Sequence, residues 1–63
     1  MGLTIKEWRR AKGISQEEMA NVCGVHVNTY RTWEEKPESI RLSAATKIAE
    51  RLGLPISEII FTM

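Results

Sequence analysis

Residues 15–36, with the sequence SQEEMANVCGVHVNTYRTWEEK, decide the predicted fold because two short helical patterns meet there at a sharp turn. Ser15 can cap the first of these helices, and Glu18 completes the capping box that marks its start. Gly24 then offers a left-handed backbone conformation from which the chain can turn. We therefore predict one helix over residues 16–23 and a second helix directly after the turn.

The second helix of this unit, residues 27–35, has two faces of different character. Tyr30 and Trp33 lie three residues apart on one face, and two large rings in so small a protein belong in the core. The opposite face carries side chains that can contact a ligand, namely Val27, Asn28, Arg31 and Thr32. His26 stands where Ser or Thr caps a helix best, so we expect a weakly capped start.

Two further helices are predicted on either side of this unit. Thr4 and Glu7 form a capping box that starts a helix over residues 5–12. Its expected inner stripe repeats every three residues: Ile5, Trp8 and Ala11. Residues 42–52 carry the most regular apolar spacing of the chain and end at Gly53, which predicts a fourth helix. That spacing is made by Leu42, Ala45, Ile48, Ala49 and Leu52.

Two proline residues interrupt the helical patterns. Pro37 disfavours helical geometry at the preceding residue, which predicts a loop over residues 36–39. After Pro55, Ser57 can cap a fifth short helix. That helix is expected to contain Ile59, Ile60 and Phe61. The sequence thus predicts an all-α fold, a compact five-helix bundle in which residues 1–63 form a single domain.

Length and composition restrict the class of protein. With 63 residues the chain has room for one domain, and a domain of this size buries about 60% of its unfolded surface. No apolar run approaches the roughly 20 residues of a membrane span, and the N-terminus lacks the apolar core of a signal peptide. We expect a cytoplasmic protein with no membrane partner. The formal net charge of +1 is low for a nucleic-acid-binding protein.

The sequence does not predict an enzyme. Cys23 and His26 are the only nucleophile and base close together, and a spacing of three residues across a turn gives poor support for a catalytic pair. A buried Cys23 and an exposed His26 explain the same residues without catalysis. One cysteine is also too few for a zinc site or an internal disulfide. We expect no catalytic residue, no metal, no cofactor and no small-molecule substrate.

The outer face of the helix over residues 27–35 fits the chemistry of the DNA major groove. Asn28 can make two hydrogen bonds to the edge of adenine, and Thr32 can pair with several bases. Val27 offers methyl groups that can pack on the methyl of thymine. Arg31 can reach either a guanine edge or a phosphate. The alternative is an ordinary solvated helix surface, since most exposed faces are polar.

The segment QEEMANVCGVHVNTYRTWEEK resembles the helix-turn-helix of the phage repressor and Cro family, also called the XRE family. The matching residues are Gln16, Ala20, Gly24, Trp33 and Glu34. The resemblance extends to IKEWRRAKGIS for the first helix and to AATKIAERLGLPISEII for the fourth and fifth. It implies a five-helix bundle of the lambda-repressor-like type, which binds an operator in double-stranded DNA, usually as a homodimer.

The resemblance also implies roles for individual residues. Gln16 matches a position that contacts phosphate and supports the recognition helix. Val27, Asn28 and Thr32 match base-reading positions, and Val27 replaces a commonly polar residue. Thr29 and Arg31 fall at positions able to contact the DNA backbone. Apart from the resemblance, Lys36 and Arg41 in the following loop are cations that can supply further phosphate contacts. A structural ion pair is expected between Arg9 and Glu34.

Two functions are compatible with this pattern. The first is a sequence-specific transcriptional regulator, a repressor, whose helix over residues 27–35 enters the major groove. The second is a protein-interaction module of the same fold, similar to an antitoxin or an anti-repressor, with little or no operator binding. The low net charge and the apolar Val27 on the outer face motivate this alternative. Salt-dependent DNA binding with sequence preference distinguishes them.

Overall fold

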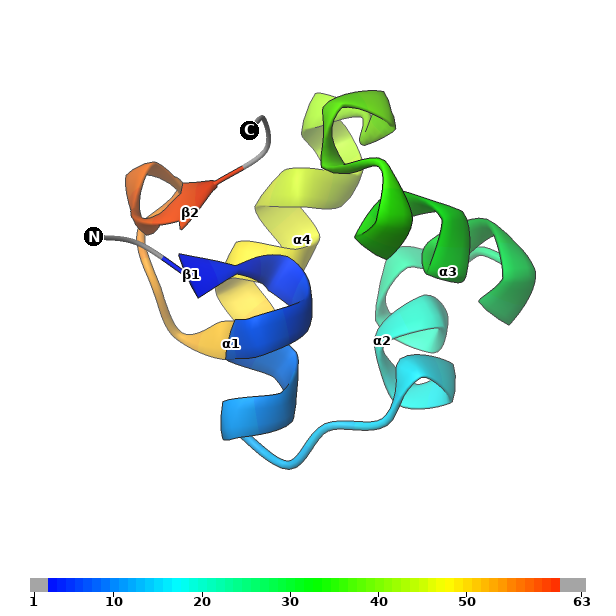
Figure 1. The fold of residues 1–63 in the computed structure, drawn as a ribbon, viewed down its shortest axis with the longest axis horizontal. Helices are drawn as coiled ribbons and strands as arrows, with labels where there is room; N and C mark the ends of the chain where they lie inside the picture. The colour runs from blue at the N-terminus through cyan, green and yellow to red at the C-terminus, as the bar shows by residue number, and fades with distance from the viewer. Residues whose placement is uncertain (1–2, 61–63) are drawn as a thin grey trace.

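The computed structural model describes residues 3–60, which form four α-helices, two short 3-10 helices and a pair of two-residue strands (Figure 1). In chain order the elements are β1 (Leu3–Thr4), α1 (Ile5–Ala11), α2 (Gln16–Cys23), α3 (Val27–Glu35), η1 (Pro37–Ser39), α4 (Leu42–Leu52), η2 (Ile56–Glu58) and β2 (Ile59–Ile60). The helical character predicted from the sequence is confirmed. Among the described residues, no helix is both long enough and apolar enough to cross a membrane.

Local capping signals place the starts of the first two helices. The Thr4 hydroxyl accepts from the backbone N–H of Glu7 at 3.2 Å, and the Glu7 carboxylate accepts from the N–H of Thr4 at 2.8 Å. Ser15 caps α2 by accepting from the N–H of Glu18 at 3.0 Å. The second capping box is only half formed, because the Glu18 carboxylate pairs with Arg51 of α4 instead. That ion pair links α2 to α4.

The core lies between α2, α3 and α4 and is closed by α1. The most deeply buried large side chains come from all four helices: Ile5, Met19, Tyr30 and Ile48. Ala20 is buried, and its small side chain lets α2 pack closely against its neighbours. Gly53 ends α4 in the left-handed conformation with φ of 74°. The predicted bounds of α2 and α4 are confirmed.

Two predicted core positions face solvent. Ala11 is exposed because Arg9, four residues after Ile5, takes the inward position on α1. Leu42 is 74% exposed because it is the first residue of α4 and lies beyond the end of the core. The inner stripe of α1 therefore consists of Ile5 and Arg9, with Trp8 packed partly against the core.

The predicted fifth helix is wrong. Residues 56–58 form η2, whose cap position is Pro55 rather than Ser57. Ile59 and Ile60 form β2, which pairs in parallel with β1 in the register Leu3 to Ile59 and Thr4 to Ile60 (Figure 1). β-branched Ile59 suits a strand, and the two short strands, which lie far apart in the sequence, satisfy each other's backbone groups there. Phe61, also assigned to that helix, lies outside the described residues.

Candidate nucleic-acid interface

α2 and α3 form a helix-turn-helix unit that is joined by a tight turn (Figure 1). Gly24 ends α2 with φ of 71°, in the left-handed region where L side chains are strained. The N–H of Val25 donates to the carbonyl of Ala20 at 3.0 Å and closes the turn. The predicted turn at Gly24 is confirmed, and it sets the direction in which α3 leaves.

His26 caps α3, contrary to the weak start that we expected. Its Nδ1 atom accepts a hydrogen bond from the backbone N–H of Asn28 at 3.1 Å. An imidazole nitrogen thus takes the place of the side-chain oxygen that most helix caps use. The imidazole is exposed and engaged in the cap, while Cys23 is buried near the carbonyl of Ala44. In the part of the chain that the structure describes, no hydrogen bond joins these two side chains.

The inner face of α3 is fixed by two aromatic residues. Tyr30 is fully buried and Trp33 is 5% exposed, which confirms their predicted place in the core. Their rings make an edge-to-face contact with centroids 6.4 Å apart and an interplanar angle of 75°. This contact sets the rotation of α3 about its axis. The residues on the opposite side are thereby turned away from the core.

The outer face of α3 carries most of the side chains predicted to contact DNA. Asn28, Thr29, Arg31 and Thr32 are exposed. The Thr32 hydroxyl donates to the backbone carbonyl of Asn28 at 3.1 Å, which leaves its oxygen lone pairs available as acceptors. Val27 differs from the expectation of a wholly outward side chain, because it is half-buried and packs against the core cluster. Only part of its surface remains available to a ligand.

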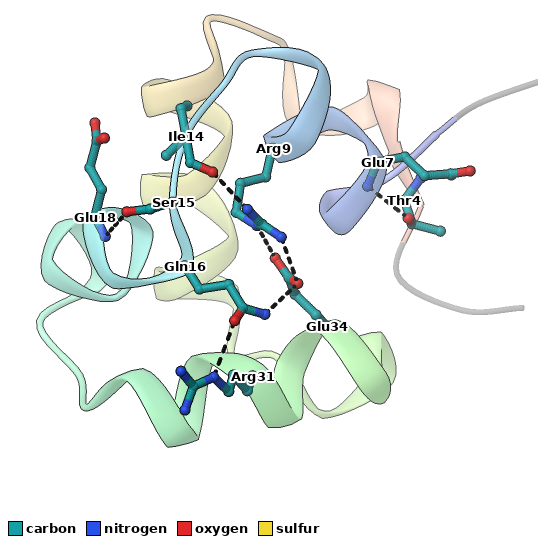
Figure 2. Close-up of polar contacts among 9 residues, drawn as sticks. All are labelled: Thr4, Glu7, Arg9, Ile14, Ser15, Gln16, Glu18, Arg31 and Glu34. Carbon is teal, nitrogen blue, oxygen red and sulfur yellow. Dashed lines mark hydrogen bonds and ion pairs between the residues drawn. The ribbon is translucent and has the colours of Figure 1, made fainter.

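Arg9 and Glu34 form the predicted ion pair between α1 and α3 (Figure 2). Arg9 donates to the Glu34 carboxylate from Nε at 2.5 Å and from Nη2 at 3.3 Å. Its Nη1 donates to the carbonyl of Ile14 at 2.7 Å. Burial of the Glu34 carboxylate would raise its pKa, but the hydrogen bonds that it accepts outweigh burial and hold the pKa below its ordinary value.

Gln16 connects this buried ion pair to the outer face of α3. Its Nε2 donates to Glu34 Oε1 at 3.0 Å, and its Oε1 accepts from Arg31 Nε at 3.1 Å (Figure 2). Both ends of the Gln16 amide therefore contact side chains of α3. A polar network runs without interruption from Arg9 through Glu34 and Gln16 to Arg31.

Arg31 extends the network to Asn28, a contact that the sequence analysis missed. Arg31 Nη1 donates to Asn28 Oδ1 at 2.8 Å, and Nη2 lies 3.9 Å from the carboxylate of Glu17. The signal in the sequence was the spacing of three residues on one helix, at which side chains meet. Both members of the pair with Glu17 are substantially exposed, so that pair contributes little to stability.

A shallow depression lies beside the outer face of α3. It is lined by Lys6, Gln16, Arg31, Glu34 and Glu35. The lining brings two cationic and two anionic side chains together, so the depression as a whole carries no strong charge. Within the described part of the chain, histidine, cysteine and carboxylate side chains form no cluster of three or more that could hold a metal ion.

Lys36 and Arg41 lie beyond the C-terminal end of α3, on either side of η1. Lys36 ends α3 with φ of −130°, so this exit does not require a glycine. Its N–H donates to the carbonyl of Thr32 at 2.8 Å, and its side chain is exposed. Arg41 holds the cap position of α4, where its side chain makes no capping bond. Neither side chain takes part in the hydrogen bonds of the Arg31 network.

Comparisons with known proteins agree with this geometry. A family model described as helix-turn-helix matches residues 5–59. A Vibrio cholerae protein described as the cryptic phage CTXphi transcriptional repressor RstR is 38% identical over 56 residues, which are 89% of this chain and 50% of the relative. The chain thus spans about half the length of that curated relative. No solved structure gives a significant match.

Proposed function

Since this chain belongs to the helix-turn-helix family, we propose that it is a sequence-specific transcriptional repressor that reads the DNA major groove with α3. The observation that carries the proposal is the division of α3 into two faces. Tyr30 and Trp33 hold one face in the core, while Asn28, Arg31 and Thr32 project polar groups outward. The similarity to a phage transcriptional repressor supports the same function.

The proposed interface assigns base contacts to α3 and phosphate contacts to its surroundings. Asn28 and Thr32 carry hydrogen-bonding groups suited to base edges, and the exposed part of Val27 suits a thymine methyl. The proposed phosphate contacts come from Gln16, Thr29, Arg31, Lys36 and Arg41. Phosphate contacts fix the position of a protein on the duplex, whereas base contacts supply the sequence preference. α2 would then cross the backbone above the groove.

A local distribution of charge supports DNA binding despite the net charge of +1. Glu34 is neutralised by Arg9, so its charge is removed from the proposed interface. Arg31 on α3 is an exposed cation, as are Lys36 and Arg41 in the segment that follows α3. Each phosphate that a cation neutralises steepens the dependence of log K on log salt concentration by about 0.9. We therefore expect DNA binding that weakens clearly as the salt concentration rises.

We further propose that the protein binds as a homodimer. Two copies of one short recognition helix read two half-sites, which should lie about one helical turn, ~34 Å, apart. The operator would then have approximate two-fold symmetry. With chromosomal or phage DNA as its partner, the protein would act in the cytoplasm.

Selection of bound duplexes from a random DNA pool tests this proposal. We expect enrichment of one motif with two related half-sites and an affinity that falls by orders of magnitude between low and moderate salt, with the preference persisting. Lys47→Ala in α4, outside the proposed interface, provides the control and should select the same motif. Absence of DNA binding at low salt would contradict the proposal and favour a protein-interaction module.

A further inference from the structure

The side chains of Asn28 and Arg31 form one unit on the outer face of α3. Arg31 Nη1 donates to Asn28 Oδ1 at 2.8 Å, so the amide oxygen of Asn28 faces the guanidinium. Within residues 3–60, the amide nitrogen of Asn28 makes no hydrogen bond. Its N–H groups are therefore available to a ligand. The orientation of Asn28 is thus set by Arg31 before any ligand binds.

A second anchor fixes the guanidinium itself. Arg31 Nε donates to Gln16 Oε1 at 3.1 Å, and Gln16 is held in turn by Glu34 at 3.0 Å. Glu34 is 2% exposed and ion-paired with Arg9, so this end of the network is rigid. A guanidinium has five N–H donors, and the two hydrogen bonds to Gln16 and Asn28 leave others unused. The Asn28–Arg31 pair is therefore held in place from the core outward.

The Asn28–Arg31 pair presents hydrogen-bond donors to a ligand and disfavours ligand groups that are themselves donors. Reading adenine with asparagine requires the amide oxygen to accept from the N6 amine while the amide nitrogen donates to N7. The amide oxygen of Asn28 already faces the positive guanidinium of Arg31, which repels the partial positive charge of the adenine N6 amine. Guanine presents two acceptors, O6 and N7, at the same groove. A set of donors matches guanine and does not match adenine.

We propose that Asn28 and Arg31 together select guanine in the major groove. This inference rests on the proposed DNA-binding function and replaces the adenine contact expected from Asn28 alone. Arg31 then acts as a specificity-determining residue rather than only as a phosphate contact. Arg31 occupies the amide oxygen of Asn28 by donating to it, which leaves the amide nitrogen to donate to the base.

The test uses the duplex that the full chain selects from a random pool. The base pair that Asn28 and Arg31 contact is identified as the one at which Asn28→Ala changes the base preference of the protein. We expect guanine there, and replacement by adenine should weaken binding about 5- to 150-fold, the range for loss of one specific base contact. Replacement by 7-deazaguanine removes the N7 acceptor and should also weaken binding. Inosine keeps O6 and N7 and should bind like guanine.

Arg31→Met provides the decisive variant, because it keeps the length of the side chain but removes its donors and charge. The free Asn28 oxygen should then accept from adenine, so the preference at this base pair should move from guanine toward adenine. A uniform loss of affinity with unchanged preference would overturn the inference and identify Arg31 as a phosphate contact only. Adenine selected by the wild-type chain would also overturn it while leaving the proposed function intact. Failure to bind any duplex would overturn the proposed function as well.

Discussion

Arg9 in α1 donates two hydrogen bonds to the carboxylate of Glu34 in α3, at 2.5 Å and 3.3 Å, and both side chains are almost entirely buried. The pair fixes the position of α3 relative to α1. Gln16 transmits that position to Arg31 on the outer face. The buried ion pair thus belongs to the same network as the proposed DNA contacts, although it cannot touch DNA itself.

Glu34→Gln should destabilise the fold strongly, because it leaves the buried guanidinium of Arg9 without its counter-charge. Removal of one partner of a buried ion pair costs about 3–5 kcal/mol. Urea unfolding followed by circular dichroism measures the loss. Glu35→Gln is the matched control, since Glu35 is exposed and the change should stay within about 0.5 kcal/mol. Equal stability of the two variants would show that the ion pair is not formed in solution.

The same carboxylate predicts a pH dependence of stability. The ordinary pKa for Glu34 is 4.5, and the folded protein lowers it. Stability from this group is therefore fully present above pH 4.5 and is lost as the pH falls through the lowered folded value. Unfolding free energies of the wild type should decrease over that acid range. The decrease should be smaller in Glu34→Gln, and identical pH profiles would contradict the assignment.

His26→Ala should weaken the start of α3, because the backbone N–H of Asn28 loses its capping acceptor. Loss of a side-chain cap costs about 0.5–2 kcal/mol. His26→Ser keeps an acceptor at this position and should be at least as stable as the wild type. Thermal unfolding of the three proteins provides the comparison. If the alanine variant matched the serine variant, the imidazole would not act as a cap.

Ile59→Ala tests the short strand pair that replaces the predicted fifth helix. Ile59 is 5% exposed, and truncation of a buried isoleucine costs about 2–5 kcal/mol. Ile56 lies three residues earlier and is 38% exposed, so Ile56→Ala is the matched control with a much smaller loss. Denaturant unfolding gives both values. A larger loss for the Ile56 variant would support the helix that the sequence predicted.

The fold was predictable wherever its signals are local. The bounds of α2 and the end of α4 follow from Ser15, Gly24 and Gly53, which act through their own backbone conformation and nearest N–H groups. The strand at Ile59 was not predictable, because its partner strand lies at the opposite end of the chain. Periodicity also could not show that Arg9 rather than Ala11 points inward, since that choice depends on Glu34 from another helix.

The candidate site also has features that were predictable from the sequence and features that were not. The two faces of α3 follow from helical spacing, so the outward positions of Asn28, Arg31 and Thr32 were predictable. The hydrogen bond between Asn28 and Arg31 depends on side-chain conformation, and helical spacing alone only makes it feasible. Val27 was expected to face outward but packs partly on the core, as does Val25 in the turn that precedes α3.

The most direct test of the proposed interface compares Asn28→Ala with Lys36→Ala on the selected duplex and on its single-base variants. Asn28→Ala should lose about 1–3 kcal/mol of binding free energy and relax the preference at one base pair. Lys36→Ala should weaken all sequences alike and reduce the salt slope by about 1. Both variants should fold like the wild type, since both side chains are exposed. Wild-type affinity and preference in both variants would contradict the assignment of α3 to the major groove.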